Sequence, residues 1–209
     1  MACGSGPTCW PRPRDWQLAD VWDQSHQVLL RQLHRAGHLD RTGACMDSAS
    51  IAAKRAAKSP APTYGPNPTD RGRAGKKRHI VTGRRGIPLT ARLSGANVHD
   101  SGMHDPLLDA IPPMYGKRGR PRCRPGKLHA DTGYDYPRCR RACTKRGIRH
   151  RIARKGIERS SHLAKHRWVV ERTFARLSKF RRFAVSTSAG PTFSWPSPSW
   201  PAPSSAFER

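Results

Sequence analysis

Apolar residues along the chain follow two periods, which predict an alternation of helices and strands. A spacing near 3.6 residues predicts helices at residues 16–38, 100–111, 136–146 and 163–182. Short apolar runs bounded by turn residues predict strands at 44–48, 78–82, 87–93, 127–131 and 149–153. The second and third of these strands flank Gly83-Arg84-Arg85-Gly86, which is a hairpin signal. Strands alternating with helices indicate an α/β fold, in which helices flank a mixed sheet.

The chain is far more basic than acidic. Its 209 residues include 40 lysines and arginines against 14 aspartates and glutamates, which gives a formal net charge of +26. Hydrophobic residues make up 35%, which supplies one modest core rather than two. Neutralising many phosphates releases counterions, so this charge favours nucleic acid over a small acidic ligand. We therefore expect one compact domain whose basic loops follow a DNA path.

Several classes of protein are disfavoured by what the sequence lacks. No run approaches the ~18 consecutive apolar residues of a membrane helix, and the N-terminal segment has no apolar signal-peptide core. The glycines from Gly116 to Gly126 do not lie between a strand and a helix, as a phosphate-binding loop requires. The six cysteines are scattered, and we expect reduced thiols. The sequence thus predicts a cytoplasmic, nucleoid-associated protein with no membrane contact and no small-molecule substrate.

Composition divides the chain into three parts. Residues 1–40 form a predicted helical segment, and residues 41–183 form the predicted domain with its basic loops. Residues 184–209 are rich in proline and serine, and their only charged residues are Glu208 and Arg209. Such a composition is typical of a disordered tail. An alternative is a shift of the reading frame after about Phe183, which stop codons in the other frames of the gene would exclude.

Acidic residues are scarce, so their positions are informative. Asp47 and Asp131 each fall at the end of a predicted strand, where ligands bind in open α/β sheets. Glu171 lies at the edge of the apolar stripe of the last predicted helix. We expect these three carboxylates to converge on one site. Local roles stay open as alternatives: Asp47 as a turn or cap residue, Asp131 as the cap of the following turn, and Glu171 as an ion-pair partner of Arg167.

A cluster of three carboxylates also predicts a metal. Carboxylates gathered in one place repel one another unless divalent cations bind between them. Mg²⁺ suits such a site because it prefers hard oxygen ligands, and Mn²⁺ can substitute for it. Two such ions activate an attacking oxygen and stabilise a leaving one during phosphoryl displacement. In a protein of this charge, the pattern predicts phosphodiester chemistry on DNA with two Mg²⁺ ions.

Six short blocks of residues occur in order along the chain. They are Met46-Asp47-Ser48-Ala49-Ser50-Ile51, Gly65-Pro66-Asn67-Pro68-Thr69-Asp70-Arg71-Gly72, Gly86-Ile87-Pro88-Leu89, Gly95-Ala96-Asn97-Val98-His99-Asp100, Leu128-His129-Ala130-Asp131-Thr132-Gly133-Tyr134-Asp135 and Arg167-Trp168-Val169-Val170-Glu171-Arg172. Together they strongly resemble the DDE transposases of bacterial insertion sequences, specifically insertion sequence family five. The resemblance covers roughly residues 2–183 and implies an RNase H-like catalytic domain whose metal-binding triad is Asp47, Asp131 and Glu171. It also implies a transposase, acting as a homo-oligomer, that cuts double-stranded DNA at terminal inverted repeats and joins the freed 3′-hydroxyl to target DNA.

The chain departs from the family signature around its last block. Arg167 matches, whereas Ala164 stands where the family has a tyrosine. Ser178 stands where the family has a lysine, and we expect the next residue, Lys179, to take the place of that lysine. The family also has a helical DNA-binding region before residue 2 and a helix in place of the proline- and serine-rich tail. We therefore expect a chain that is truncated at the N-terminus and altered at the C-terminus.

Further residues receive supporting roles. By the resemblance, Asn97, His99 and Asp100 lie near the active site, where His99 polarises a phosphate or, alternatively, stabilises a turn. Arg167 orients Glu171 or contacts the scissile phosphate, or is a surface ion-pair residue. The basic residues expected to bind DNA are Arg71, Arg73, Lys76, Lys77, Arg118, Arg120, Arg122, Arg124 and Lys179.

Two other functions are consistent with part of this pattern. A transposase remnant that binds DNA without catalysis would keep the charge and lose the chemistry. A basic RNA-binding protein of ribosomal type fits the charge, but it does not account for the ordered blocks that carry the acids. We therefore expect a transposase, with the inactive DNA-binding remnant as the alternative.

Overall fold

The computed structural model describes residues 12–53, 64–114, 123–157 and 160–180. Within these residues the strands are β1 (Ala44–Ala52), β2 (Gly65–Pro66), β3 (Ala74–Gly83), β4 (Pro88–Gly95), β5 (Lys127–Ala130) and β6 (Arg149–Ile152). The α-helices are α2 (Arg12–Leu18), α3 (Val21–Arg35), α4 (His104–Asp109), α5 (Pro137–Lys145) and α6 (Ser160–Ser178). Two short 3₁₀ helices, η1 and η2, span Asp100–Met103 and Thr132–Tyr134.

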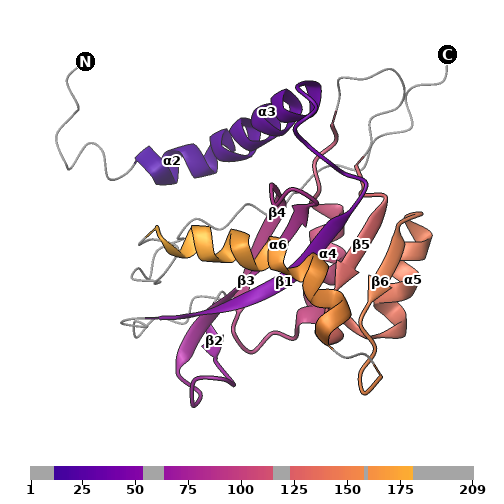
Figure 1. Cartoon of the computed structure of the whole chain (residues 1–209). Helices are drawn as coiled ribbons and strands as arrows, with labels where there is room; N and C mark the ends of the chain where they lie inside the picture. Colours follow the sequence, from indigo (N-terminus) through magenta and orange to yellow (C-terminus); the bar gives the residue numbers. More distant parts are fainter. Residues whose placement is uncertain (1–11, 54–63, 115–122, 158–159, 181–209) are drawn as a thin grey trace.

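All of these strands belong to one mixed sheet with β1 at its centre (Figure 1). On one side β1 pairs antiparallel with β3, from Ala44 opposite Gly83 to Ala52 opposite Gly75. On the other side β1 pairs in parallel with β5, and β5 pairs in parallel with β6. Strands β2 and β4 both pair antiparallel with β3, along its other edge. The predicted α/β fold, a mixed sheet flanked by helices, is confirmed.

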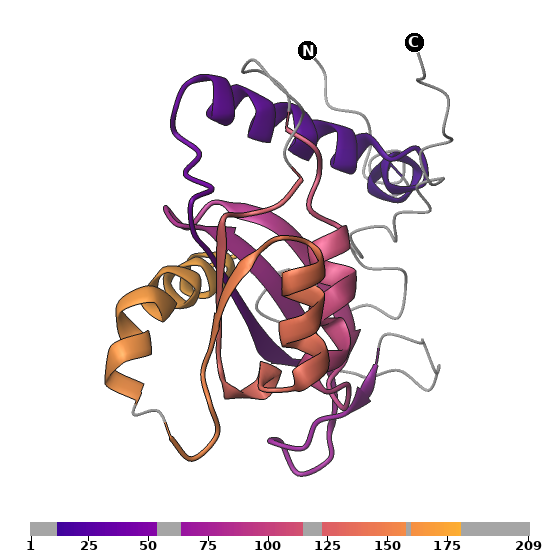
Figure 2. The ribbon, with the colours of Figure 1, turned by 90° about the vertical axis from the view of Figure 1, so that its right-hand side faces the viewer.

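The helices cover the two faces of the sheet unequally. Figure 2 shows α6 on one face and α5 on the opposite face, with α3 running across one end of the sheet. Helix α6 packs mainly against β1 and β3, whereas α5 packs against β6 and α4 packs against β3 and β4. The part of β5 and β6 on the α6 side is therefore less covered than the rest of the sheet.

Alternate residues of each strand supply two separate cores, because successive side chains of a strand point to opposite faces. Ala44 and Met46 of β1 belong to the larger core, on the side of α4 and α5. Cys45 belongs to the smaller core, on the side of α6, whose buried members are Cys45, Ile80, Val170 and Phe174. The larger core also takes in α3 through Leu30, which is 1% exposed.

The N-terminal helix differs from the prediction. The helical pattern of residues 16–38 predicts one helix, but the structure has two, α2 and α3. Asp20, which separates them, has a φ of 54°. This left-handed conformation is unfavourable for a residue other than glycine and does not continue an α-helix. Apolar periodicity carries no signal for such a break, because the break depends on the backbone conformation of a single residue.

The central hairpin is longer than the prediction. Strand β3 begins at Ala74, so Lys76 and Lys77 lie in the strand rather than before it, as the strand predicted at 78–82 would have them. Strand β1 continues to Ala52 instead of ending near Ser48, because β3 pairs with it along its whole length. Pairing with a neighbouring strand thus extends both elements beyond the limits that their own composition indicates.

The remaining predicted elements are confirmed with small shifts at their ends. The hairpin strand β4, strands β5 and β6, and helices α5 and α6 lie where the sequence predicts them, and the predicted helix at 100–111 is η1 followed by α4. Within the described residues Cys45, Cys123, Cys139 and Cys143 are free thiols. No helix in the described ranges is both long and apolar enough to cross a membrane. The tail at 184–209 lies outside the described residues.

Leu128 offers a test of the larger core. Its side chain is fully buried at the centre of the sheet, so Leu128→Ala should lower the free energy of unfolding by about 2–5 kcal/mol. Leu18, which is 78% exposed, is the control, and Leu18→Ala should change stability by less than about 0.5 kcal/mol. Urea unfolding followed by circular dichroism measures both. Equal effects would contradict the assignment of the core.

Candidate active site

Asp47 lies in the middle of β1, not at the end of a strand as predicted. Strand β5, its parallel neighbour, ends at Ala130, which lies opposite Met46. Asp47 therefore follows the last residue of β1 that pairs with β5, as Asp131 follows the last residue of β5. The two side chains share the α6 side of the sheet, because each stands one position after a residue of the larger core.

Asp131 is the N-cap of η2. Its Oδ1 accepts a hydrogen bond of 3.0 Å from the backbone N–H of Gly133. Asp47 makes a similar local contact, since its Oδ1 accepts a hydrogen bond of 2.8 Å from the N–H of Ser48. In each aspartate a backbone donor thus fixes one carboxylate oxygen and orients the group.

Helix α6 brings a third carboxylate and a cation to the same side. Nη2 of Arg167 lies 3.7 Å from Oδ2 of Asp47 and 3.8 Å from Oε1 of Glu171, one turn along the helix. The guanidinium of Arg167 therefore lies between the acid on the sheet and the acid on the helix. Val170, next to Glu171, is fully buried and holds the helix against the sheet.

Two of the three local roles considered from the sequence are present, whereas Asp47 lies within a strand and is neither a turn nor a cap residue. Asp131 caps a turn, Asp47 accepts from the adjacent backbone, and Glu171 pairs with Arg167. These contacts do not compete with a shared site, because the same three side chains face the same region between β1, β5 and α6. The charges of Asp131 and Glu171 both raise the pKa of Asp47, which is expected of acidic groups that lie close together.

Burial and mutual repulsion both act on the two aspartates. Burial raises the pKa of Asp47 to about 6, and the charges of Asp131 and Glu171 add to this rise. The N–H of Ser48 and the charge of Arg167 oppose it. Burial likewise raises the pKa of Asp131, while Arg167 lowers it. Such a group of carboxylates is electrostatically unfavourable without a cation, and Arg167 supplies one positive charge.

The side chains fit the predicted metal in their chemistry. Asp47, Asp131 and Glu171 offer only carboxylate oxygens, which are the ligands that Mg²⁺ prefers. The raised pKa values of Asp47 and Asp131 and the guanidinium of Arg167 among the acids indicate a place where positive charge is needed. In the described part of the chain, no three acidic, histidine or cysteine side chains lie close enough together to form a complete metal site. Arg167 is the cation that balances these acids in this arrangement.

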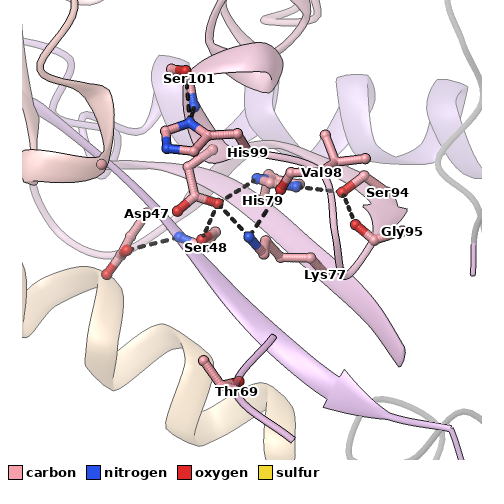
Figure 3. A network of polar contacts seen from close by, with 12 residues as sticks. Asp47, Ser48, Thr69, Lys77, His79, Ser94, Gly95, Val98, His99 and Ser101 are labelled. Carbon is pink, nitrogen blue, oxygen red and sulfur yellow. Dashed lines mark hydrogen bonds and ion pairs between the residues drawn. The ribbon is translucent and has the colours of Figure 1, made fainter. Parts of the chain in front are cut away.

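Asp100 joins the site to a polar network inside the sheet. Its Oδ1 accepts hydrogen bonds from Oγ of Ser48, at 2.8 Å, and from Nζ of Lys77, at 3.0 Å. Nδ1 of His79 lies 3.9 Å from the same oxygen. Figure 3 shows Ser48, Lys77 and His79 pointing toward one another, with Asp47 to one side and joined to Ser48. Asp100 also acts electrostatically on Asp131, so it lies beside the acidic site as predicted.

His79 extends this network into the protein. It is fully buried, and its Nε2 lies 2.8 Å from Oγ of Ser94, which in turn donates to the carbonyl of Gly95 (Figure 3). Burial lowers the pKa of His79 to about 4, so the ring is neutral near pH 7. Lys77, with Nζ also donating to the carbonyl of Val98 at 3.0 Å, is the cation that balances Asp100.

His99 and Asn97 lie beside this network rather than in the acidic cluster. His99 caps η1, where its Nδ1 accepts from the N–H of Ser101, and its ring packs edge-on against Tyr136. This contact is the turn-stabilising role considered from the sequence. The charge of His99 still acts on Asp131, so the ring lies within electrostatic reach of the site. Asn97 is exposed, and its amide oxygen lies close to Gly65 and Gly95.

The basic residues predicted to bind DNA have different surroundings. Lys76 is only 3% exposed, with its ammonium over the ring of Tyr64, so it is not presented on the surface as the prediction requires. Lys77 pairs with Asp100 inside the network. Exposed positions are occupied by Arg71, Arg73, Arg124 and Lys179. Arg118, Arg120 and Arg122 lie outside the described residues. The two corrections share a cause, because β3 takes Lys76 and Lys77 into the sheet.

Two residues of the site were missed by the sequence analysis as functional candidates. Ser48 connects Asp47 to Asp100, through its N–H and its hydroxyl respectively. Tyr134 is fully buried, and the charges of Asp100, Asp47 and Asp131 add to the effect of burial in raising its pKa. Both lie within the blocks that carry the resemblance, next to the two aspartates. The apolar pattern gives no signal for them, because their roles depend on contacts between distant segments.

A mixed sheet whose central strands bring two aspartates together, under a helix that carries a glutamate, defines a domain of the RNase H-like class. A family model described as Transposase DDE domain matches residues 38–191. The chain therefore belongs to the DDE transposase family, which confirms the family predicted from the sequence.

Two relatives come from Burkholderia cepacia. One is named as a transposase for insertion sequence element IS402 and is 55% identical over 124 residues, which cover 59% of this chain and 59% of the relative. The other is named as an uncharacterized 16.2 kDa protein of the same insertion element and is 46% identical over 83 residues, covering 34% of this chain and 56% of the relative. The chain thus spans less than two thirds of the length of these relatives.

A solved structure also resembles the chain in its fold. It is a cryo-electron microscopy structure of the intasome of simian T-cell lymphotropic virus in complex with PP2A regulatory subunit B56 gamma. The match covers 68% of this chain and 40% of the viral chain, with 17% sequence identity and a TM-score of 0.43. This likeness is too weak to support a functional inference.

The pair of Lys77 and Asp100 can be tested by a double-mutant cycle. Because both side chains are mostly shielded from solvent, Lys77→Gln and Asp100→Asn should couple by about 0.5–3 kcal/mol in the free energy of unfolding. The matched control is the more exposed pair of Arg146 and Asp109, where Arg146→Gln and Asp109→Asn should couple by less than about 1 kcal/mol. If the effects of Lys77→Gln and Asp100→Asn on the free energy of unfolding are additive, the ion pair between these residues does not stabilise the protein.

Proposed function

We propose that this chain is the catalytic part of an insertion-sequence transposase, which cleaves double-stranded DNA at the ends of a mobile element and transfers the cut strand. Membership of the DDE transposase family supports the class of reaction. The meeting of Asp47 and Asp131 where the pairing of β1 with β5 ends is the observation that supports the site most directly. Glu171 and Arg167 complete this site from α6.

The proposed reaction has two displacement steps at phosphorus. In the first, a water oxygen attacks a phosphodiester of the element end, and the bond from phosphorus to the 3′-oxygen breaks. The attacking water gives up a proton, and the leaving 3′-oxygen takes one up to become a free hydroxyl. In the second step this 3′-hydroxyl loses its proton and attacks a phosphodiester of the target DNA. The bond from that phosphorus to the target's own 3′-oxygen breaks, and this oxygen takes up a proton to become a free hydroxyl.

The carboxylates of the chain have a clear part in this scheme. Asp47, Asp131 and Glu171 would bind two Mg²⁺ ions, or Mn²⁺ in their place, and these supply Lewis-acid stabilisation of the attacking and leaving oxygens. Asp47 and Asp131 are already oriented by backbone donors at Ser48 and Gly133. Orientation before binding reduces the entropy lost when the site is assembled. Asp100 keeps Ser48 in place and so positions Asp47 indirectly.

Arg167 has the position of a phosphate-binding residue. Its guanidinium lies among the acids, is partly exposed and makes only long contacts of 3.7 and 3.8 Å with them. We propose that it orients Glu171 and contacts the scissile phosphate, which an arginine binds with two parallel hydrogen bonds. Exposed basic residues such as Arg71, Arg73, Arg124 and Lys179 would add contacts to the DNA backbone, and a homo-oligomer would hold two element ends.

Asp131→Asn tests the chemistry. The variant should lose Mg²⁺- or Mn²⁺-dependent nicking of supercoiled DNA by roughly 100-fold or more, because an amide does not provide the anionic oxygen that a metal ion needs. Its salt-dependent binding to DNA should be kept, since the substitution removes a negative charge rather than a positive one. Gel electrophoresis and fluorescence anisotropy measure the two properties separately.

The matched control is Asp109→Asn, which makes the same chemical change at an exposed acid paired with Arg146. It should nick like the wild type. Equal nicking by Asp131→Asn would refute the assignment of the acidic site. Nicking by neither the wild type nor the variants, with DNA binding retained, would instead identify the chain as the inactive DNA-binding remnant.

Metal binding can be followed without any reaction. A ligand that binds only the folded state stabilises it, by about 2.7 kcal/mol at one hundred times its Kd, so Mg²⁺ should raise the Tm of the wild-type protein. The rise should be much smaller for Asp47→Asn and for Asp131→Asn. Differential scanning calorimetry at constant ionic strength, with Na⁺ replacing Mg²⁺ in the control, measures it. An equal rise in all three proteins would argue against a metal at these residues.

A further inference from the structure

The sheet has an open basic face beside the acidic site. On the α6 side, β5 presents Lys127 and His129, and β6 presents Arg149 and Arg151 in register with them. Lys127, His129 and Arg149 line a hollow of about 350 Å³, together with Arg84 from the turn between β3 and β4. We call these four lining residues, Arg84, Lys127, His129 and Arg149, the basic trough.

The trough is a part of the sheet that no helix of the described chain fills. Helix α6 packs mainly on β1 and β3, and it lines the hollow through Val169. The larger core and helix α5 lie on the opposite face (Figure 2). The side chains of Lys127 and Arg149 make no hydrogen bond or ion pair within the described residues, and Arg149 is exposed. They are therefore available to a ligand.

The arrangement of charge in the trough is unfavourable for the protein alone. Lys127 lies directly beside Arg149 on the neighbouring strand, and like charges in such pairs are destabilising. Among the described residues, no carboxylate lines the hollow. Asp40 is close enough to Arg84 for their charges to interact, although the hydrogen bond from Thr42 is the main cause of the lowered pKa of Asp40. An anion bound in the trough would remove the repulsion between Lys127 and Arg149.

The trough leads into the acidic site. His129 stands two residues before Asp131 on β5, and Cys45, which forms part of the floor, stands two residues before Asp47 on β1. Alternate residues of a strand share a face at intervals of about 6.6 Å, so Lys127 lies about 13 Å from Asp131 on the same face of the sheet, with the buried His129 between them. A ligand that fills the trough and reaches the acids must be an extended polyanion rather than a single small ion.

The geometry points to the basic trough as the path of one DNA strand, whose phosphate backbone lies along β5 and β6 and ends at the acidic site. This inference rests on the proposed function for the identity of the polyanion. It adds Arg84, Lys127 and Arg149 to the basic residues expected to contact DNA, while the buried His129 forms part of the wall of the hollow. The trough also defines the direction from which the DNA strand approaches Asp131. The basic loops do not define this direction.

The test compares two neutralising double variants. Lys127→Gln with Arg149→Gln removes two charges from the trough, and Arg141→Gln with Lys145→Gln removes two from the exposed surface of α5 on the opposite face. Fluorescence anisotropy with a short labelled DNA duplex gives the affinity over a series of salt concentrations. Loss of two phosphate contacts should lower the salt slope by about 2 and weaken binding about 30-fold at physiological salt.

We expect this loss for the trough variant and a small change for the α5 variant. Equal losses would show that only net charge matters, and unchanged binding by the trough variant would overturn the inference. The trough variant should also keep or raise its Tm, because it removes a repulsive pair. If it unfolds, the single variant Arg149→Gln, at an exposed position, replaces it, with Arg141→Gln as control. Failure of Asp131→Asn to affect nicking would refute the chemistry but leave this binding result unchanged.

Discussion

The pairing of β1 on both of its edges is the constraint on which the rest of the molecule depends. Antiparallel pairing with β3 keeps β1 extended past the point where β5 ends, and this puts an aspartate in mid-strand beside one at a strand end. The pleat then decides which side each residue faces, with Ala44 and Met46 in one core and Asp47 on the other side. A shift of register by one residue would bury the carboxylate of Asp47 in the larger core.

The charge of the protein gives this acidic site an unusual setting. A net charge of +26 attracts phosphates to every basic surface, yet carboxylates at the centre of the sheet repel them. The chain limits this conflict by pairing three of the acids locally: Asp100 with Lys77, and Asp47 and Glu171 with Arg167. Positive charge is thus placed within a few ångströms of Asp47, Asp100 and Glu171, and a phosphate approaching the site meets guanidinium and ammonium groups as well as carboxylates.

The sequence predicts those features that depend on a short stretch of chain. Helix α6 and strand β5 carry their apolar periodicity within themselves, and their predicted positions are confirmed. The length of β1 depends on its pairing with β3, so the prediction of a strand end at Asp47 was wrong. The contact of Lys77 with Asp100 joins residues on different elements, and no periodic pattern encodes it. The break at Asp20 depends on one backbone angle, which composition does not reveal.

The two cores also divide the molecule into parts of unequal strength. Helix α6 is attached through a few residues, Val170 and Phe174 above all, and through contacts of Arg172 and Thr173 with the turn between β3 and β4. The opposite face is held by a much larger core. Local opening starts where few apolar contacts must be broken, so α6 should exchange its amide hydrogens before the central strands do. Because Glu171 and Arg167 are on this helix, the acidic site is assembled from a rigid half and a separable half.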